Sequence, residues 1–126
     1  MQAKGVDLSG LHWPGISCPG VITPTDIDGF IDFDNRLFIV FELKTAGEKI
    51  AGGQKMALER MVDALGQFVP TYLIIATHST PTSQDIDAAS CRVEATRYKW
   101  IWHPHDDGIT LREFIDRVRA TWHISA

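Results

Sequence analysis

The chain has 126 residues, of which 44% are hydrophobic and 22% are charged, and its 12 Lys and Arg against 16 Asp and Glu give a formal net charge of −4. A chain of this length buries roughly 65–70% of the surface that it exposes when unfolded, so we expect one domain spanning residues 1–126 that needs no disulfide or structural metal. The composition excludes a disordered chain and a disulfide scaffold, and the negative charge argues against a protein that coats nucleic acid by bulk electrostatic attraction.

The cysteines and the hydropathy pattern predict where the protein resides. Cys18 and Cys91 are isolated and form no CxxC motif, so we expect a reducing compartment and take the cytoplasm as the location. No apolar stretch approaches the roughly 20 residues that a membrane span requires, and the first ten residues hold no apolar signal-peptide core. We therefore expect no membrane partner.

The N-terminal part of the chain predicts a lead-in followed by a β-hairpin. Residues 1–24 contain three prolines and no sustained periodicity, so they predict a loop-rich segment. Residues 25–33 predict a strand, and Asp34 and Asn35 predict a turn after it. Residues 37–44 are apolar on both faces until Glu42 and Lys44, which is typical of a central strand covered on both sides.

A helix and a second buried strand are expected next. Apolar residues recur at helical spacing and a glycine follows them; the positions are Leu58, Met61, Val62 and Leu65, with Gly66 as the stop. Gln54 lies four residues before the first of these, so we expect it on the sheet-facing side of the first turn. Residues 71–77 predict a parallel strand.

The C-terminal part predicts further strands and a final helix. Residues 92–103 predict one or two strands, of which 98–103 is the clearer, and Trp100 and Trp102 are expected to share a face in the core or an interface. Thr110 is expected to cap a helix whose apolar positions follow a 3.6-residue period. The fold class that these elements predict is α/β with a mixed sheet.

Two charged residues close the second strand and need a chemical explanation. Glu42 and Lys44 follow an apolar run, and such groups are costly to desolvate unless they are paired, bound to a metal or facing an opening. Because they are two residues apart, they share one face of the sheet.

The length of the hairpin loop decides which residue joins them. If residues 34–36 form a three-residue loop, Phe33 opposes Leu37 and Asp28 opposes Glu42 on the same face. A two-residue loop would place Asp28 on the other face. With the longer loop, two carboxylates come close enough to hold one divalent cation between them.

The run "TDIDGFIDFDNRLFIVFELK", followed by "GGQKMALERMVDAL", resembles the core of the PD-(D/E)XK nuclease superfamily. The resemblance covers about residues 24–77, and it is greatest to small virus-type nuclease modules and Holliday-junction resolvases. It implies a restriction-endonuclease-like core, in which helices flank a mixed central β-sheet.

The resemblance also implies roles for single residues. Asp28 matches the first metal-binding acid of the family, and Asp26 is a rival for that position because "TDID" offers two acids on one face. Glu42 matches the second acid and Lys44 the catalytic lysine. Gln54 matches the accessory residue of the following helix.

The activity implied is metal-dependent hydrolysis of DNA phosphodiester bonds, with branched recombination and repair intermediates among the candidate substrates. Mg²⁺, or Mn²⁺ in its place, would be held by Asp28, Glu42 and the backbone carbonyl of Leu43. A small acidic monomer has little surface for gripping a duplex, so a homodimer, or a partner protein that delivers the DNA, is also expected.

Three other interpretations stay open. Asp28, Glu42 and Lys44 could form a cross-strand salt-bridge cluster without catalytic meaning. The chain could be a catalytically idle nuclease-fold module with a binding or structural role in a phage or mobile-element assembly. Finally, the histidines and aspartates of residues 103–107 (HPHDD) could form a metallohydrolase site, since both residue types are common metal ligands.

Overall fold

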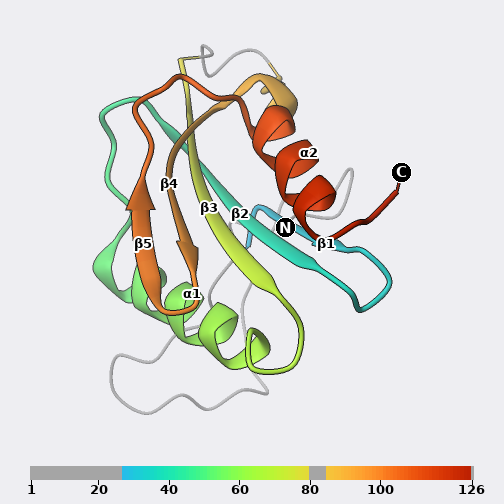
Figure 1. Cartoon of the computed structure of the whole chain (residues 1–126). Coiled ribbons are helices and arrows are strands. Elements are labelled where there is room, and N and C mark those ends of the chain that lie inside the picture. Colours follow the sequence, from blue (N-terminus) through green and yellow to red (C-terminus); the bar gives the residue numbers. More distant parts are fainter. Residues whose placement is uncertain (1–26, 80–84, 126) are drawn as a thin grey trace.

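The computed structural model describes residues 27–79 and 85–125, so the predicted lead-in and Asp26 lie outside the described residues. The elements in chain order are β1 (Gly29–Asp32), β2 (Phe38–Thr45), α1 (Gly52–Leu65), β3 (Thr71–His78), a short 3₁₀ turn (Ala88–Ser90), β4 (Arg92–Tyr98), β5 (Ile101–Pro104) and α2 (Leu111–Thr121). The strands form one five-stranded sheet in the order β1-β2-β3-β4-β5 (Figure 1). Among the strand pairs of the described residues only β2–β3 is parallel, so the predicted α/β class with a mixed sheet is confirmed.

The β1–β2 hairpin has the predicted register. Gly29 opposes Phe41, and the backbone N–H of Phe33 donates to the carbonyl of Leu37 at 3.0 Å, as expected for the longer loop. The turn itself uses left-handed backbone at the first two loop positions, with φ of 55° and 59°. The first strand is shorter than predicted and begins at Gly29, with Asp28 immediately before it.

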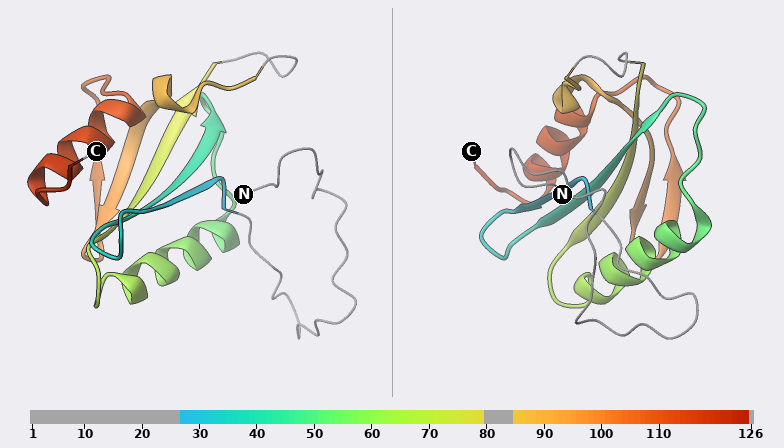
Figure 2. Two further views of the ribbon diagram at one scale, coloured as in Figure 1. Left: turned by 90° about the vertical axis from the view of Figure 1, so that its right-hand side faces the viewer. Right: turned by 180° about the vertical axis from the view of Figure 1, so that it is seen from behind.

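The two helices cover opposite faces of the sheet (Figure 2). One core lies under α2 and includes Ile39 and Phe114, while the other lies under α1 and includes Val40 and Leu58. Successive residues of β2 therefore enter different cores, as the two-residue period of a strand requires. The even-numbered positions of β2, which include Glu42 and Lys44, face α1.

α1 ends and α2 begins where the sequence predicts. Gly66 follows α1 at its C-terminus, and its backbone N–H donates to the carbonyls of the last turn. Thr110 caps α2 in a reciprocal capping box with Glu113. Such a box satisfies N–H groups that have no partner within the helix. Within the described residues, no helix has the length and apolar character needed to cross a membrane.

Two strands lie in the region predicted to hold one or two, but the bounds predicted for the strand at residues 98–103 are wrong, because a tight turn divides that segment. Lys99 and Trp100 adopt left-handed backbone, with φ of 49° and 66°, and connect β4 to β5 as a two-residue hairpin loop. Trp100 is exposed at this turn, whereas Trp102 lies in β5 and packs at the edge of the α1 core. The two tryptophans therefore do not share one strand.

Candidate functional site

Asp28 and Glu42 meet where β1 begins and β2 nears its end. The backbone N–H of Asp28 donates to Oε1 of Glu42 at 3.0 Å, and the N–H of Leu43 donates to Oδ2 of Asp28 at 2.8 Å. The Asp28 side chain thus accepts a hydrogen bond from the backbone of β2. This bond lies one residue beyond the end of the β1–β2 pairing, which stops at Gly29. Glu42 is buried, at 5% exposure, and Asp28 is exposed. The two carboxylate-bearing residues are therefore adjacent, one inside and one open to solvent.

The first turn of α1 completes this group. Gln54 is the third residue of the helix, and its Nε2 donates to Oε2 of Glu42 at 3.1 Å. Each carboxylate oxygen of Glu42 therefore has its own donor, one from the hairpin and one from the helix. These two hydrogen bonds fix the orientation of the carboxylate.

Burial raises the pKa of Glu42 to about 7, from an ordinary value of 4.5. Desolvation is the largest cause; the hydrogen bond from the Asp28 backbone opposes it, and the negative charge of Asp28 adds to it. Among the ion pairs of residues 27–79 and 85–125, none includes Glu42. This carboxylate is held in place by neutral donors beside a second acid, and within the described residues it forms no ion pair.

Lys44 lies on the same face but points to a different partner. Its Nζ pairs with Oε2 of Glu94 on β4 at 2.9 Å and also donates to the backbone carbonyl of Glu48. The lysine side chain is 9% exposed and that of Glu94 is 49% exposed. The cross-strand salt-bridge cluster of Asp28, Glu42 and Lys44 is therefore not what the structure contains, because the lysine pairs across to β4.

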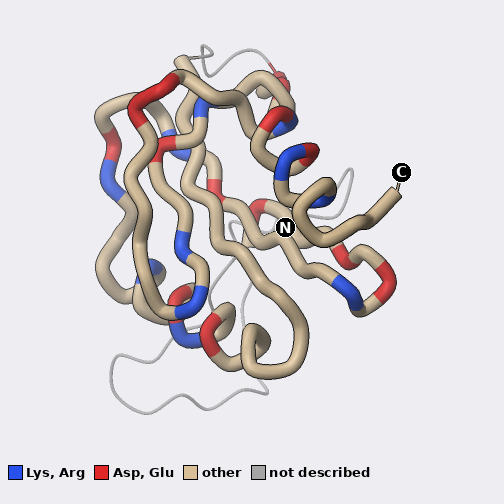
Figure 3. The backbone as a smooth tube through the Cα atoms, viewed as in Figure 1, with Lys and Arg blue, Asp and Glu red and all other residues tan. Residues whose placement is uncertain are grey.

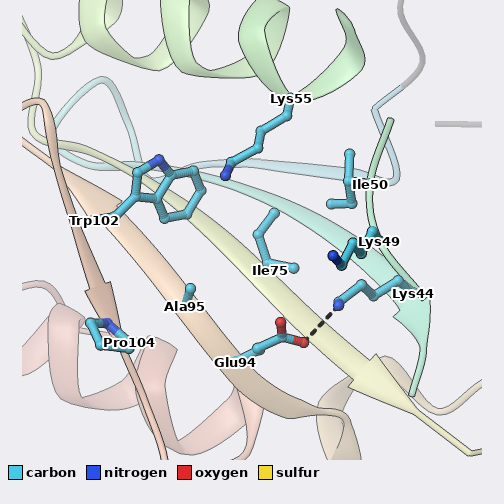
Figure 4. A pocket seen from close by; sticks show the side chains of 9 residues that line it. All are labelled: Lys44, Lys49, Ile50, Lys55, Ile75, Glu94, Ala95, Trp102 and Pro104. Carbon is cyan, nitrogen blue, oxygen red and sulfur yellow. Dashed lines mark ion pairs between the residues drawn. The ribbon is translucent and has the colours of Figure 1, made fainter. Parts of the chain in front are cut away.

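Beside Lys44 a pocket of about 410 Å³ opens between α1, β4 and β5 (Figure 4). Its walls carry three lysines, one acid and five other residues, namely Lys44, Lys49, Lys55, Glu94, Ile50, Ile75, Ala95, Trp102 and Pro104. We call it the lysine pocket. Neither Glu94 nor the pocket was predicted, because both depend on how β4 and β5 pair with β3, which no local pattern in the sequence indicates.

The donor set of the acid pair fits a hard divalent cation such as Mg²⁺, which prefers carboxylate, carbonyl and water oxygens. Within the described part of the chain, no group of three or more His, Cys, Asp or Glu side chains is placed to hold a metal. With two carboxylates, Asp28 and Glu42, a cation would have to complete its shell with backbone oxygens, waters and substrate oxygens. Mg²⁺ commonly binds in that way.

Two of the four histidines and aspartates of residues 103–107 have structural contacts. Nε2 of His105 lies 3.0 Å from Oγ1 of Thr96, and Oδ1 of Asp107 accepts from the backbone N–H of Ile109 at 3.3 Å. The first contact joins the β5–α2 connection to β4 and the second lies within the connection, and both favour a structural role for these two residues over a metal site.

Comparisons with known proteins add nothing to the evidence that the site provides about function. No protein-family model matches the chain, and no curated protein or solved structure matches it either.

Proposed function

We propose that the protein is a metal-dependent nuclease with a restriction-endonuclease-like core, which hydrolyses phosphodiester bonds of DNA. The observation that carries the proposal is the buried carboxylate of Glu42, oriented by Asp28 and Gln54 and lacking a cationic partner among the described residues. A buried anion without a cation is costly, so a site that retains one is a candidate for binding a cation in function.

Asp28, Glu42 and the backbone carbonyl of Leu43 would hold one Mg²⁺ or Mn²⁺. A bound divalent cation would act as a Lewis acid, lowering the pKa of a bound water and offsetting negative charge at the phosphate. Gln54 and the backbone N–H of Asp28 keep the Glu42 carboxylate in one orientation, so little reorganisation is required when the substrate arrives.

The reaction is the addition of water to a phosphodiester. A bond forms between phosphorus and the water oxygen, and the bond from phosphorus to one ester oxygen breaks. One proton of the water passes to solvent and the leaving oxygen takes up a proton, which gives a phosphate monoester and a hydroxyl group. Lys44 would donate to a phosphate oxygen, exchanging its contact with Glu94 for one with the substrate.

The ion pair between Lys44 and Glu94 also supports a second candidate function. A lysine held by an acid and by a backbone carbonyl is already satisfied, as it would be in a nuclease-fold module that only binds or assembles. The two functions differ in one observable property, which is whether DNA is cut.

The experiment that tests the proposal is a cleavage assay with single-stranded, duplex and junction DNA in Mg²⁺, Mn²⁺ or EDTA. We expect cleavage with Mg²⁺ or Mn²⁺, none in EDTA, and loss of at least about 100-fold in rate for Glu42→Gln. Asp116→Asn is the matched control, since this exposed acid of α2 lies on the opposite face of the sheet. Undiminished cleavage by Glu42→Gln would refute the proposed site, and no cleavage under any condition would favour the binding module.

A further inference from the structure

The lysine pocket concentrates positive charge in a protein whose net charge is −4. Of its three lysines, only Lys44 forms a salt bridge within the described residues. Lys49 and Lys55 are exposed and also line the pocket, and in Figure 4 the Lys55 ammonium extends from α1 toward the ring of Trp102. An anion entering the pocket would thus meet two ammonium groups that pair with no carboxylate of residues 27–79 and 85–125.

The same pocket also offers an apolar and aromatic surface. Trp102 is held in place because its indole N–H donates to Oε2 of Glu59 on α1. Ile50 and Ile75 also line the pocket. Nζ of Lys55 is 5.1 Å from the centroid of the Trp102 ring, in a cation–π contact. A phosphate would draw this ammonium away and leave the ring face free.

The pocket therefore pairs a site for phosphate with a site for a flat aromatic group, and its volume lies in the usual range for small-molecule sites. A nucleotide combines these two chemical groups. A base within a duplex is stacked and paired on both sides, so only an unpaired base can turn into such a pocket without an added cost of unstacking.

We propose that the lysine pocket binds one unpaired nucleotide of the substrate strand, with the base against Trp102 and the phosphate on Lys49 and Lys55. The inference rests on the proposed function and names the part of the substrate that the site selects. Because Lys44 belongs both to the proposed catalytic group and to the pocket wall, the bound nucleotide would lie next to the phosphate that is cut.

The test is binding of fluorescein-labelled (dT)₁₂ to the full chain by fluorescence anisotropy. The comparison probes are a 12-mer of the same backbone with abasic sites, and the (dT)₁₂ strand paired with (dA)₁₂. We expect the abasic strand to bind at least about fivefold more weakly, the effect of losing about 1 kcal/mol of base stacking. The duplex should also bind more weakly than the single strand.

The lysines are tested with the double variant Lys49→Ala and Lys55→Ala. It should lower affinity for (dT)₁₂ and reduce the slope of log K against log salt by about 0.7 for each phosphate that the variant no longer binds. Arg112→Ala removes an exposed cation of α2 on the other face of the sheet and should leave the affinity for (dT)₁₂ unchanged.

Equal binding of the abasic and normal strands, or tighter binding of the duplex, would overturn the inference. This failure is separate from that of the proposed function, because the probes report binding and not cleavage. A protein that cuts DNA but binds abasic strands equally well would keep the nuclease proposal and lose the pocket. A Glu42→Gln variant that still cuts, in a protein that binds abasic strands more weakly, would keep the pocket and refute Glu42 as part of the catalytic site.

Discussion

The buried carboxylate of Glu42 should lower the folding stability of the metal-free protein at neutral pH. Its pKa is about 7 in the folded chain and 4.5 as the ordinary value, so the folded state holds the proton more tightly. The stability that comes from the protonated form is complete below about pH 4.5 and is lost as the pH rises through 7. Functional groups are commonly kept at such a cost to stability.

Glu42→Gln should therefore stabilise the protein in EDTA at pH 8, by about 1–3 kcal/mol, and the gain should fade toward pH 5. Urea denaturation of both proteins at the two pH values measures it. Glu113→Gln is a control of opposite sign, because hydrogen bonds from Thr110 lower the pKa of Glu113. That variant should lose stability at neutral pH and lose less in acid. A gain for Glu42→Gln that does not change with pH would contradict the interpretation.

Replacing Lys44 should lower the rate of cleavage and leave the Asp28–Glu42 pair intact. Lys44→Ala leaves Glu94 as a half-exposed acid that water can solvate, and the lost packing of the buried lysine stem should lower the unfolding free energy by about 1–2 kcal/mol. Cleavage should fall by at least about 100-fold, because the ammonium near the phosphate is gone. The check is single-turnover cleavage beside urea denaturation. Glu94→Gln, which frees the lysine, should retain cleavage; a loss as large as that of Lys44→Ala would mean that the ion pair itself is required.

At the scale of the elements, the β1–β2 hairpin depends on a close approach at its first residue. A Cβ placed on Gly29 would lie 2.0 Å from the ring of Phe41, which is partly buried against the α2 core. Gly29→Ala should push the ring aside and destabilise the protein by about 1–3 kcal/mol. Thermal unfolding measures the loss. At Gly52, which begins α1, a Cβ would meet nothing within 4 Å, so Gly52→Ala should be neutral or slightly stabilising. Equal effects of the two variants would refute this explanation.

The hairpin register and the position of Gln54 could be predicted from the sequence, because each follows from a local period. A three-residue loop fixes which residues of two strands oppose each other, and a 3.6-residue period fixes which helix residues face the sheet. Both predictions agree with the contacts that converge on Glu42.

The turn at Lys99 and Trp100 could not be predicted in this way, since neither residue type favours the left-handed backbone that both adopt. The ion-pair partner of Lys44 could not be predicted from the sequence either. Glu94 comes beside it only through the β3–β4 pairing, whose register shifts between Ile75 and Ala76. Such long-range contacts carry no signature in the local sequence.

At the scale of the whole molecule, the net charge limits the affinity for DNA. Acidic and basic residues are interspersed along the two described helices and along β2 and β4 (Figure 3), and the chain is negative overall. DNA should therefore bind weakly in EDTA, and Ca²⁺ at constant ionic strength should raise the affinity by about tenfold, the effect of offsetting two charges near a phosphate. Anisotropy with a labelled DNA probe measures this. Tight binding in EDTA that Ca²⁺ leaves unchanged would favour a metal-independent binding module.

The central claim is that Asp28 and Glu42 form a site for one divalent cation. Calorimetric titration of the full chain with Mn²⁺ tests it most directly. We predict one bound ion for the wild-type protein, affinity reduced at least about tenfold for Asp28→Asn and Glu42→Gln, and little change for Lys44→Ala and Asp116→Asn. Unchanged Mn²⁺ binding by both acid variants, or no binding to the wild-type protein, would contradict the account.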